Sequence, residues 1–282
     1  MARVRSPLRQ RIRILAEALE LPWWSRPQTY LFRYRLALPP GLEVPPAVTV
    51  VCPLPRTLEY QAVSDLRFQA PPDGVGEERQ YGNRFAWWRV AGPISLGARM
   101  GYDATVAGRP RRANAAAGLP LAATSLPGDG YLEVTDAVQA IAARLSQRIV
   151  DRGTYIFRCY EYVVGSLRYG NPIAGLYRAV DALELPSVDC GGFDTLLGAL
   201  LLARGIPARV VSGFWAGYPD AAMHAWLECE GAPGVWAPLD PSVDHLYRRG
   251  RSRRSGRQYF VGSDRVALSV GTDWQFRLAG QP

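Results

Sequence analysis

The sequence contains no lysine, two histidines and four cysteines among its 282 residues. Its formal net charge of +8 therefore comes entirely from arginine. With so few imidazoles, any chemistry that pairs a cysteine with a histidine must use His224 or His245. This scarcity narrows the search for a reactive site before any motif is considered.

Long apolar runs are also missing. No stretch approaches the roughly 18 apolar residues that a transmembrane helix needs, although 48% of the residues are hydrophobic. The N-terminal residues are basic, but no continuous apolar segment or small-residue cleavage site follows them. We therefore expect no transmembrane segment, no signal peptide and a cytoplasmic location.

The four cysteines at positions 52, 159, 190 and 229 are scattered, and the Cys-x-x-Cys pattern is absent. This spacing predicts neither a zinc site nor a disulfide framework. We expect no metal and no cofactor. Cys52, Cys159 and Cys229 are expected to be small buried apolar residues.

The excess of arginine leaves an acidic partner or a nucleic acid open as alternatives to a solvated basic surface. The densest run, Arg248 to Arg257, has no interleaved aromatic residues and is therefore a poor stacking platform for bases. We expect no nucleic-acid partner. We interpret the run as a mobile loop after the strand of Asp240, at the rim of a cleft, with His245 on the surface before it. Binding of an acidic group by this loop stays open.

Residues 1–27 are predicted to form an N-terminal arm. Within residues 5–20, Leu8, Ile12, Leu15 and Leu19 lie on one helical stripe. The stripe predicts an amphipathic helix that packs against the body of the protein or against a second copy, which would give a homo-oligomer. A membrane surface is the alternative.

From residue 28 the apolar period changes to two. Short alternating segments separated by turn residues over residues 28–106 predict a β-sandwich-like domain. The expected strands cover the alternation that begins near 28 and residues 48–52, 61–68, 78–80, 85–90 and 94–106, with a hairpin turn at 81–84. No reactive constellation is visible in this domain, which we expect to wall one side of a cleft.

Residues 107–130 are rich in glycine, proline, alanine and arginine and read as a linker. Helices are expected in the following part, over residues 133–150, 154–167 and 173–183, and a fourth begins at Cys190. Strands follow that helix. Residues 131–282 therefore form an α+β core in which helices precede the strands.

Cys190 begins an almost wholly apolar segment that runs to Gly205, with Pro207 just beyond it. Glycine after the last turn and proline soon afterwards are typical of a helix end, and Ser187 or Asp189 can cap the start. We therefore expect Cys190 in the first turn of a buried helix. The unpaired N–H groups and the helix dipole there favour a thiolate and should lower the thiol pKa.

His224 lies in a segment that alternates like a strand, and a turn at 231–234 leads to a second strand that ends before Asp240. If the loop has an odd number of residues centred near Ala232, His224 and Asp240 lie opposite each other on one face. An even number would place them on opposite faces. A Cys, a His and an Asp in this order can supply a thiol nucleophile, a base and an orienting carboxylate.

Three motifs occur in order: Cys190 before an apolar helix and Arg-Gly-Ile-Pro-Ala-Arg, His-Ala-Trp at 224–226, and Trp-x-Pro-Leu-Asp-Pro-Ser at 236–242. Together they resemble the transglutaminase-like superfamily, whose members are circularly rearranged relatives of papain. The resemblance implies Cys190 as nucleophile, His224 as base and Asp240 as the orienting carboxylate. It also implies a papain-like core of helices packed on an antiparallel sheet.

The resemblance extends beyond these motifs. Residues 28–106 look like the β-rich domain that precedes the core in many members, and residues 259–269 look like the strand pair after the catalytic Asp in bacterial ones. Val188 replaces a glycine that is frequent two residues before the Cys. Gly191 replaces the bulkier residue of animal transglutaminases, which argues against a close functional match to those protein-crosslinking enzymes.

The resemblance implies acyl transfer from an amide or thioester of a peptide or small molecule, through a thioester on Cys190. The acceptor is water, as in a peptidase or amidase, or an amine, as in amide formation, and the sequence leaves both open. The alternative function is a catalytically silent papain-like scaffold that binds a peptide or protein partner.

Further site residues are assigned from the requirements of this chemistry. The Cys190 backbone N–H is one expected donor to the oxyanion, and Tyr169 or Asn171 are candidates for the second. Trp215 and Trp226 either line an acyl pocket or pack in the core.

Overall fold

The structure is a computed structural model that describes residues 12, 16, 27–36, 47–91, 100–113, 119–122, 124–128, 130–171, 175–218, 222–275 and 278. The amphipathic helix expected over residues 5–20 therefore lies outside the described residues, apart from Ile12 and Ala16. No helix in the described part of the chain is long and apolar enough to cross a membrane.

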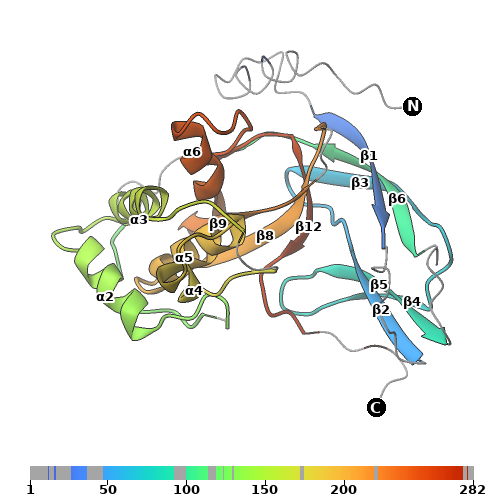
Figure 1. Cartoon of the computed structure of the whole chain (residues 1–282), viewed down its shortest axis with the longest axis horizontal. Helices are drawn as coiled ribbons and strands as arrows, with labels where there is room; N and C mark the ends of the chain where they lie inside the picture. Colours follow the sequence, from blue (N-terminus) through green and yellow to red (C-terminus); the bar gives the residue numbers. More distant parts are fainter. Residues whose placement is uncertain are drawn as a thin grey trace.

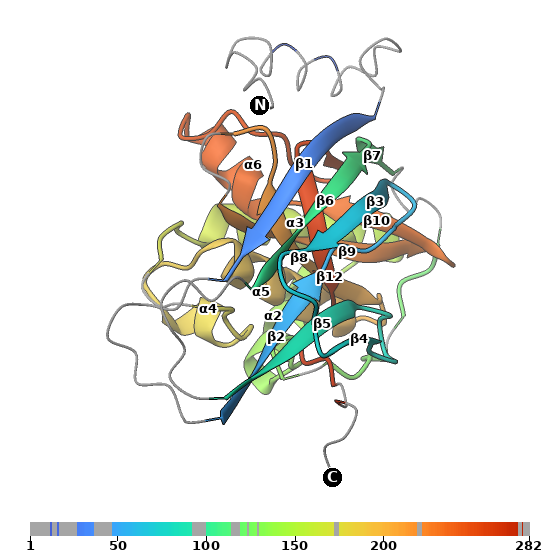
Figure 2. The same cartoon turned by 90° about the vertical axis from the view of Figure 1, so that its right-hand side faces the viewer.

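The region before the core contains two three-stranded antiparallel sheets, which face the viewer in Figure 2. The first has the order β1-β6-β3 and the second β2-β5-β4. Their buried side chains share one apolar cluster that includes Cys52, Trp88 and Tyr102. The predicted sheet-rich region before the core is thereby confirmed. Its strands are β1 (Gln28–Arg35), β2 (Ala47–Leu54), β3 (Gln61–Phe68), β4 (Gly74–Glu77), β5 (Arg84–Ala91) and β6 (Gly101–Gly108).

Strand β1 shows why this sequence forms a sheet with one buried face. Burial alternates residue by residue along it, as a period of two requires. Phe32 and Tyr34 contact Tyr102 of β6, and the rings of Tyr34 and Tyr102 stack with their centroids 5.5 Å apart. Phe32 also contacts Phe214, which lies in the core, at 5.6 Å. The aromatic face of β1 therefore joins the β-rich region to the rest of the molecule.

The turn between β4 and β5 is longer than the sequence predicted. Residues 78–80 were expected as a strand, but β4 ends at Glu77. The buried carboxylate of Glu78 accepts hydrogen bonds from the backbone N–H groups of Gln80, Tyr81 and Asn83. These bonds replace ladder pairing and fold the segment into a turn. Similarly, the strand expected over 94–106 is described only as β6, because residues 92–99 lie outside the described part.

The core has a four-stranded antiparallel sheet in the order β10-β9-β8-β12, with helices on one side of it (Figure 1). Helix α5 packs on β8 and β9 and contacts α2, α3, α4 and α6. The predicted α+β class is confirmed. The helices are α2 (Asp136–Leu145), α3 (Arg152–Ser166), α4 (Asp181–Glu184), α5 (Cys190–Leu202) and α6 (Pro241–Arg248). The strands are β8 (Ala208–Trp215), β9 (Met223–Ala232), β10 (Val235–Leu239) and β12 (Arg265–Val270).

One helix prediction was wrong and one helix was missed. The helix expected over residues 173–183 is reduced to the four residues of α4, and Gly175 has a φ of 102°, which a right-handed helix does not allow. Helix α6 was not predicted, although Asp240 caps it and Pro241 occupies its first turn. Both residues are typical of a helix start, so this signal was present in the sequence.

The segment 107–130 is more than a linker. It begins inside β6, and Arg111–Arg112 form a short strand, β7. Strand β7 pairs with β11 (Phe260–Val261), which precedes β12. Backbone pairing to a distant segment, invisible in local composition, gives these residues their structure.

Two side-chain amides of the β-rich region bind the edge strand β12. Gln61 donates to the carbonyl of Ala267 and accepts from its N–H, both at 2.8 Å. Asn83 does the same with Val270, at 2.7 and 2.8 Å. Both amides are buried. They satisfy backbone groups that an edge strand would otherwise leave unpaired, and they fix β12 against the β-rich region.

Candidate active site

Cys190 occupies the first position of helix α5, as predicted. Asp189 caps the helix, and its carboxylate accepts from the N–H of Gly191 at 2.8 Å. Cys190 is partly buried, whereas Cys52, Cys159 and Cys229 are fully buried. Cys190 is therefore the most exposed of the four cysteines.

The two glycines after Cys190 are explained by packing. A Cβ on Gly192 would meet the side chain of Val188 at 2.5 Å, and one on Gly191 would meet Leu176 at 2.7 Å. Contacts this short require the neighbours to shift. The helix start therefore fits closely against the segments that precede it.

His224 and Asp240 are hydrogen-bonded, with 2.9 Å between Nε2 of His224 and Oδ2 of Asp240. His224 lies near the start of β9, and Asp240 follows β10 as the cap of α6. The other carboxylate oxygen of Asp240 accepts from the N–H of Val243 at 3.1 Å and the hydroxyl of Ser242 at 3.2 Å. Asp240 is fully buried, so these partners replace the water that it loses.

The hairpin achieves this contact in a different way from the one predicted. Its turn has two residues, at 233–234, and the register shifts between Val235 and Trp236. Beyond this bulge, Leu239 pairs with Leu227. The next step of the register places Asp240 two residues along from His224 on the same face, as a diagonal pair. The bulge thus compensates for the even turn.

The pKa shifts of these two groups follow from burial and charge. Burial lowers the pKa of His224 more than the charge of Asp240 raises it, so the imidazole favours its neutral form. Burial raises the pKa of Asp240, but the charges of His224 and Arg265 outweigh it and leave the pKa below its usual value. Asp240 is therefore a carboxylate, and its bond to Nε2 leaves Nδ1 of His224 for another partner.

The expected lowering of the Cys190 pKa is wrong. Burial raises the pKa of the thiol, the carboxylate charge of Asp189 raises it further, and the N–H of Ala225 opposes both. The Asp189 carboxylate occupies N–H groups that would otherwise stabilise a thiolate. The shifts of Cys190 and His224 together favour the uncharged states of both groups.

Asp194 is a site residue that the sequence did not reveal. It lies one helical turn after Cys190 on α5 and is fully buried. Neither of its carboxyl oxygens has a hydrogen-bond partner among the described residues. Burial raises its pKa well above the usual value, and the charges of Asp240 and Asp189 add to this. Asp194 therefore favours the protonated acid.

The two oxyanion candidates lie in different surroundings. Tyr169 forms a bridge with Val188, two residues before Cys190. Burial raises the pKa of Tyr169, and its electrostatic interactions with Cys190 and Asp189 add to this. Asn171 is exposed, and its side-chain oxygen accepts from the hydroxyl of Tyr177 at 3.3 Å. These surroundings favour Tyr169 over Asn171.

Trp215 and Trp226 both lie next to His224. The ring of Trp215 stacks on the imidazole at 4.3 Å with an interplanar angle of 21°. Trp226 is fully buried and belongs to an apolar cluster with Val211 and Ala267. Core packing therefore describes Trp226, and Trp215 holds the plane of the His224 ring.

The arginine-rich run is separated from the strand of Asp240 by α6. Its first residue, Arg248, ends that helix and pairs with Asp244 and Glu161. Arg254 lies over the rings of Trp215 and Tyr218, at 4.8 and 4.5 Å. Within the run, Arg254 therefore packs against the aromatic side of the site.

His245 is buried, which corrects the expected surface position. It lies in α6, is 2% exposed, and its Nδ1 is 2.9 Å from the carbonyl of Val164. Its ring also contacts Phe193 edge-on, at 5.0 Å. His245 therefore joins α6 to α3 and α5.

A further residue that the sequence missed is Arg265 of β12. Its guanidinium donates to Oδ2 of Asp240, the oxygen that also bonds to His224. No local pattern marks Arg265, because the contact depends on how β12 pairs with β8. Among the described residues, no group of three or more His, Cys, Asp or Glu side chains could hold a metal ion.

Residues 139–241 match the family model of the transglutaminase-like superfamily. This stretch begins in α2 and includes Cys190, His224 and Asp240. The chain therefore contains a transglutaminase-like superfamily domain. No curated protein matches the sequence.

Two solved structures are similar to this chain. A candidate cysteine protease from Cytophaga hutchinsonii has a TM-score of 0.57 at 16% identity, over 86% of this chain and 80% of that chain. The periplasmic domain of TgpA from Pseudomonas aeruginosa gives a TM-score of 0.39 at 17% identity, over 75% of each chain. At such identity the first similarity supports the fold alone, and the TM-score of the second is too low to carry an argument.

Proposed function

We propose that the protein is a cysteine-dependent acyl-transfer enzyme in which Cys190 is the nucleophile, His224 the base and Asp240 the residue that orients His224. The observation that carries the proposal is the hydrogen bond between His224 and Asp240. Cys190, the most exposed cysteine, begins helix α5, and this helix packs on β9, the strand that carries His224. A family model that spans all three residues supports it.

The reaction begins from uncharged Cys190 and His224, which the pKa directions favour. His224 removes the thiol proton as sulfur attacks the carbonyl carbon of an amide or thioester. The tetrahedral oxyanion accepts from the Cys190 N–H and from Tyr169. Collapse breaks the bond to the leaving amine or thiol, which takes the proton from His224, and leaves an acyl-thioester. Water or an amine then attacks this thioester and restores Cys190.

The substrate class is an acyl group of a peptide or small molecule, with water or an amine as acceptor. Amine transfer requires that the acceptor is held in the site more effectively than water is. Both acceptors belong to the same proposal, because they share every step up to the acyl-thioester.

The test is to trap the acyl-enzyme. The wild type is incubated with p-nitrophenyl acetate, an activated ester, and the site of acetylation is found by mass spectrometry of peptides. Acetylation of Cys190 is expected, with loss in Cys190→Ala and strong slowing in His224→Asn. Chasing with buffer or with an added amine then identifies the acceptor. Folded wild type that acquires no acetyl group on Cys190 would favour the silent scaffold instead.

A further inference from the structure

Arg265 occupies a fully enclosed position behind His224 and Asp240. Its side chain is 3% exposed and donates to Oδ2 of Asp240 and to the carbonyl of Ser255. The guanidinium also lies 4.6 Å from the ring centroid of Trp215 and 3.5 Å from the carboxylate of Asp264. A buried arginine with this many partners has a fixed geometry.

We propose that Arg265 is a positioning residue that shares one carboxylate oxygen of Asp240 with His224 and thereby keeps His224 available as a neutral base. This inference rests on the proposed function, because it assigns a role within the same site. Arg265 would thereby join Cys190, His224 and Asp240 as a fourth residue of the site. It lies on β12, outside the stretch that matches the family model.

The role of Arg265 follows from charge balance in a buried site. Asp240 is an enclosed carboxylate, and a buried negative charge requires a compensating positive one. Arg265 supplies that charge permanently, because a guanidinium does not deprotonate in proteins. Without Arg265, a protonated His224 would be the nearest positive charge able to compensate the Asp240 carboxylate. The imidazole would then be held as a cation and could not accept the thiol proton.

Apart from Arg254, the other groups around His224 supply no positive charge. Asp264 is negative and accepts from the hydroxyls of Tyr218 and Ser255. On the helix side, Cys190 and Asp194 favour their uncharged forms. Arg265 also lowers the pKa of His224 through its charge, in the direction that the proposal requires. The charged and titratable groups around His224 are Asp240 before α6, Arg265 and Asp264 at β12, Tyr218 after β8, Cys190 and Asp194 on α5, and Arg254, which lies over Trp215 and Tyr218.

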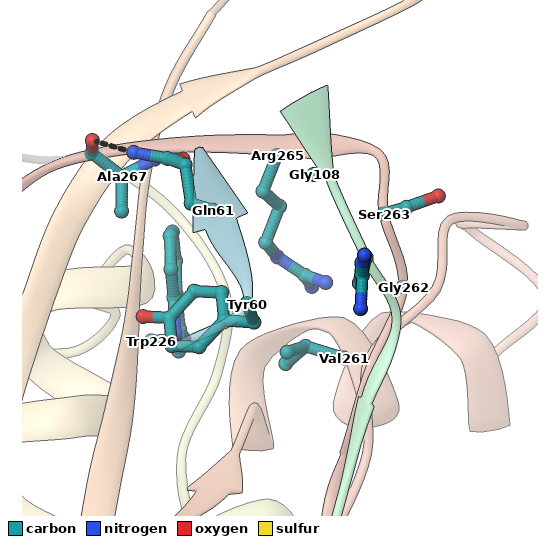
Figure 3. A pocket seen from close by; sticks show the side chains of 10 residues that line it. Tyr60, Gln61, Gly108, Trp226, Val261, Gly262, Ser263, Arg265 and Ala267 are labelled. Carbon is teal, nitrogen blue, oxygen red and sulfur yellow. Dashed lines mark hydrogen bonds between the residues drawn. The ribbon is translucent and has the colours of Figure 1, made fainter. Parts of the chain in front are cut away.

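The β-rich region holds Arg265 in place. Arg265 lines a small pocket between the two parts of the molecule together with Tyr60, Gln61 and Trp226 (Figure 3). Figure 3 also shows Gln61 bonded to Ala267, two residues after Arg265 on the same strand. The position of the guanidinium therefore depends on contacts made by β3 as well as on the core.

The test measures the titration of His224 directly. The chain has two histidines, so the ¹⁵N NMR signals of the imidazoles are assigned with a single variant, His224→Asn. Arg265→Gln removes the charge, and Arg265→Lys retains it. Arg209→Gln is the matched control, because Arg209 forms an ion pair with the buried Glu228 and lies over Trp236 in the same sheet without contact to Asp240.

We expect Arg265→Gln to raise the titration midpoint of His224 by roughly one pH unit, the typical effect of removing a nearby charge. Arg265→Lys and Arg209→Gln should leave the midpoint within about 0.3 units of the wild type, since the charge beside Asp240 is retained. An unchanged midpoint in folded Arg265→Gln overturns the proposal. If that variant does not fold, a shift of a full unit in Arg265→Lys overturns it instead.

The titration requires no turnover, so its result is independent of the acylation test. A raised midpoint in Arg265→Gln supports the positioning role even where Cys190 is not acylated. Conversely, acylation of Cys190 with an unchanged midpoint leaves the proposed function standing and removes Arg265 from it.

Discussion

Asp194 is the residue whose chemistry conflicts most with its surroundings. It is fully buried and has no hydrogen-bond partner among the described residues. An ionised carboxylate in this position would be very costly, so the residue favours the protonated acid. The free energy of folding must therefore depend on pH through Asp194.

We predict that Asp194→Asn is more stable than the wild type at neutral pH. The folded pKa of Asp194 is raised, so its contribution to stability is full below the unfolded pKa of about 3.9 and is lost as the pH rises toward the folded pKa. The advantage of the variant should grow by about 1.4 kcal/mol per pH unit across this window. Urea unfolding of both proteins between pH 4 and pH 8 measures it. A difference that does not change with pH would show that Asp194 is ionised in the fold.

Residues that carry a motif could be predicted from sequence, whereas residues that depend on distant pairing could not. Cys190, His224 and Asp240 each lie at the start or end of an element that local patterns reveal. Arg265 reaches Asp240 because β12 pairs with β8, and no local signal encodes that pairing. The burial of His245 likewise depends on distant segments and could not be predicted locally. Its charged neighbours in the sequence indicated a surface position instead.

At the scale of elements, helix α5 was predictable because its apolar length, cap and terminal glycine all lie within one short segment. The hairpin of β9 and β10 was predictable in existence but not in register. A bulge between Val235 and Trp236 determines which face Asp240 joins, and sequence patterns do not locate bulges reliably. Helix α4 was overpredicted because the backbone at Gly175 leaves the helical region.

The attachment of β12 gives a prediction for one side chain. Gln61→Leu should lower the free energy of unfolding by about 2–4 kcal/mol, because the N–H and carbonyl of Ala267 lose their partner in a buried position. Gln69→Leu, just beyond the other end of β3, is the control, since an exposed substitution changes stability by about 0.5 kcal/mol at most. Thermal or urea unfolding compares the two. Equal stability of the two variants would mean that the Gln61 bonds are not important for β12.

The whole molecule is joined across its two parts by a shared apolar cluster. Ala216, Val266 and Leu268 of the core pack in the same cluster as Cys52 and Tyr102 of the β-rich region. The buried amides Gln61 and Asn83 add hydrogen bonds across the same boundary. The two parts are therefore not independent in energy, although the sequence suggested a linker between them.

We predict a single cooperative unfolding transition for the described parts together. Loss of either part would expose the shared cluster and leave backbone groups of β12 unpaired. Tryptophan fluorescence and far-ultraviolet circular dichroism should give the same urea midpoint. Two separate transitions, or midpoints that differ between these probes, would show that the β-rich region and the core fold independently.

The most direct test of the central claim is the rate at which iodoacetamide alkylates Cys190 in the native protein, followed by intact mass between pH 5 and pH 9. The other cysteines are buried, so one alkylation is expected. Because burial and the Asp189 carboxylate raise the pKa of Cys190, its reactivity must come from His224. We predict that His224→Asn slows the reaction roughly 100-fold at neutral pH, the effect typical of removing a general base, to below the rate of a free thiol. Equal rates in the wild type and the variant would contradict the account.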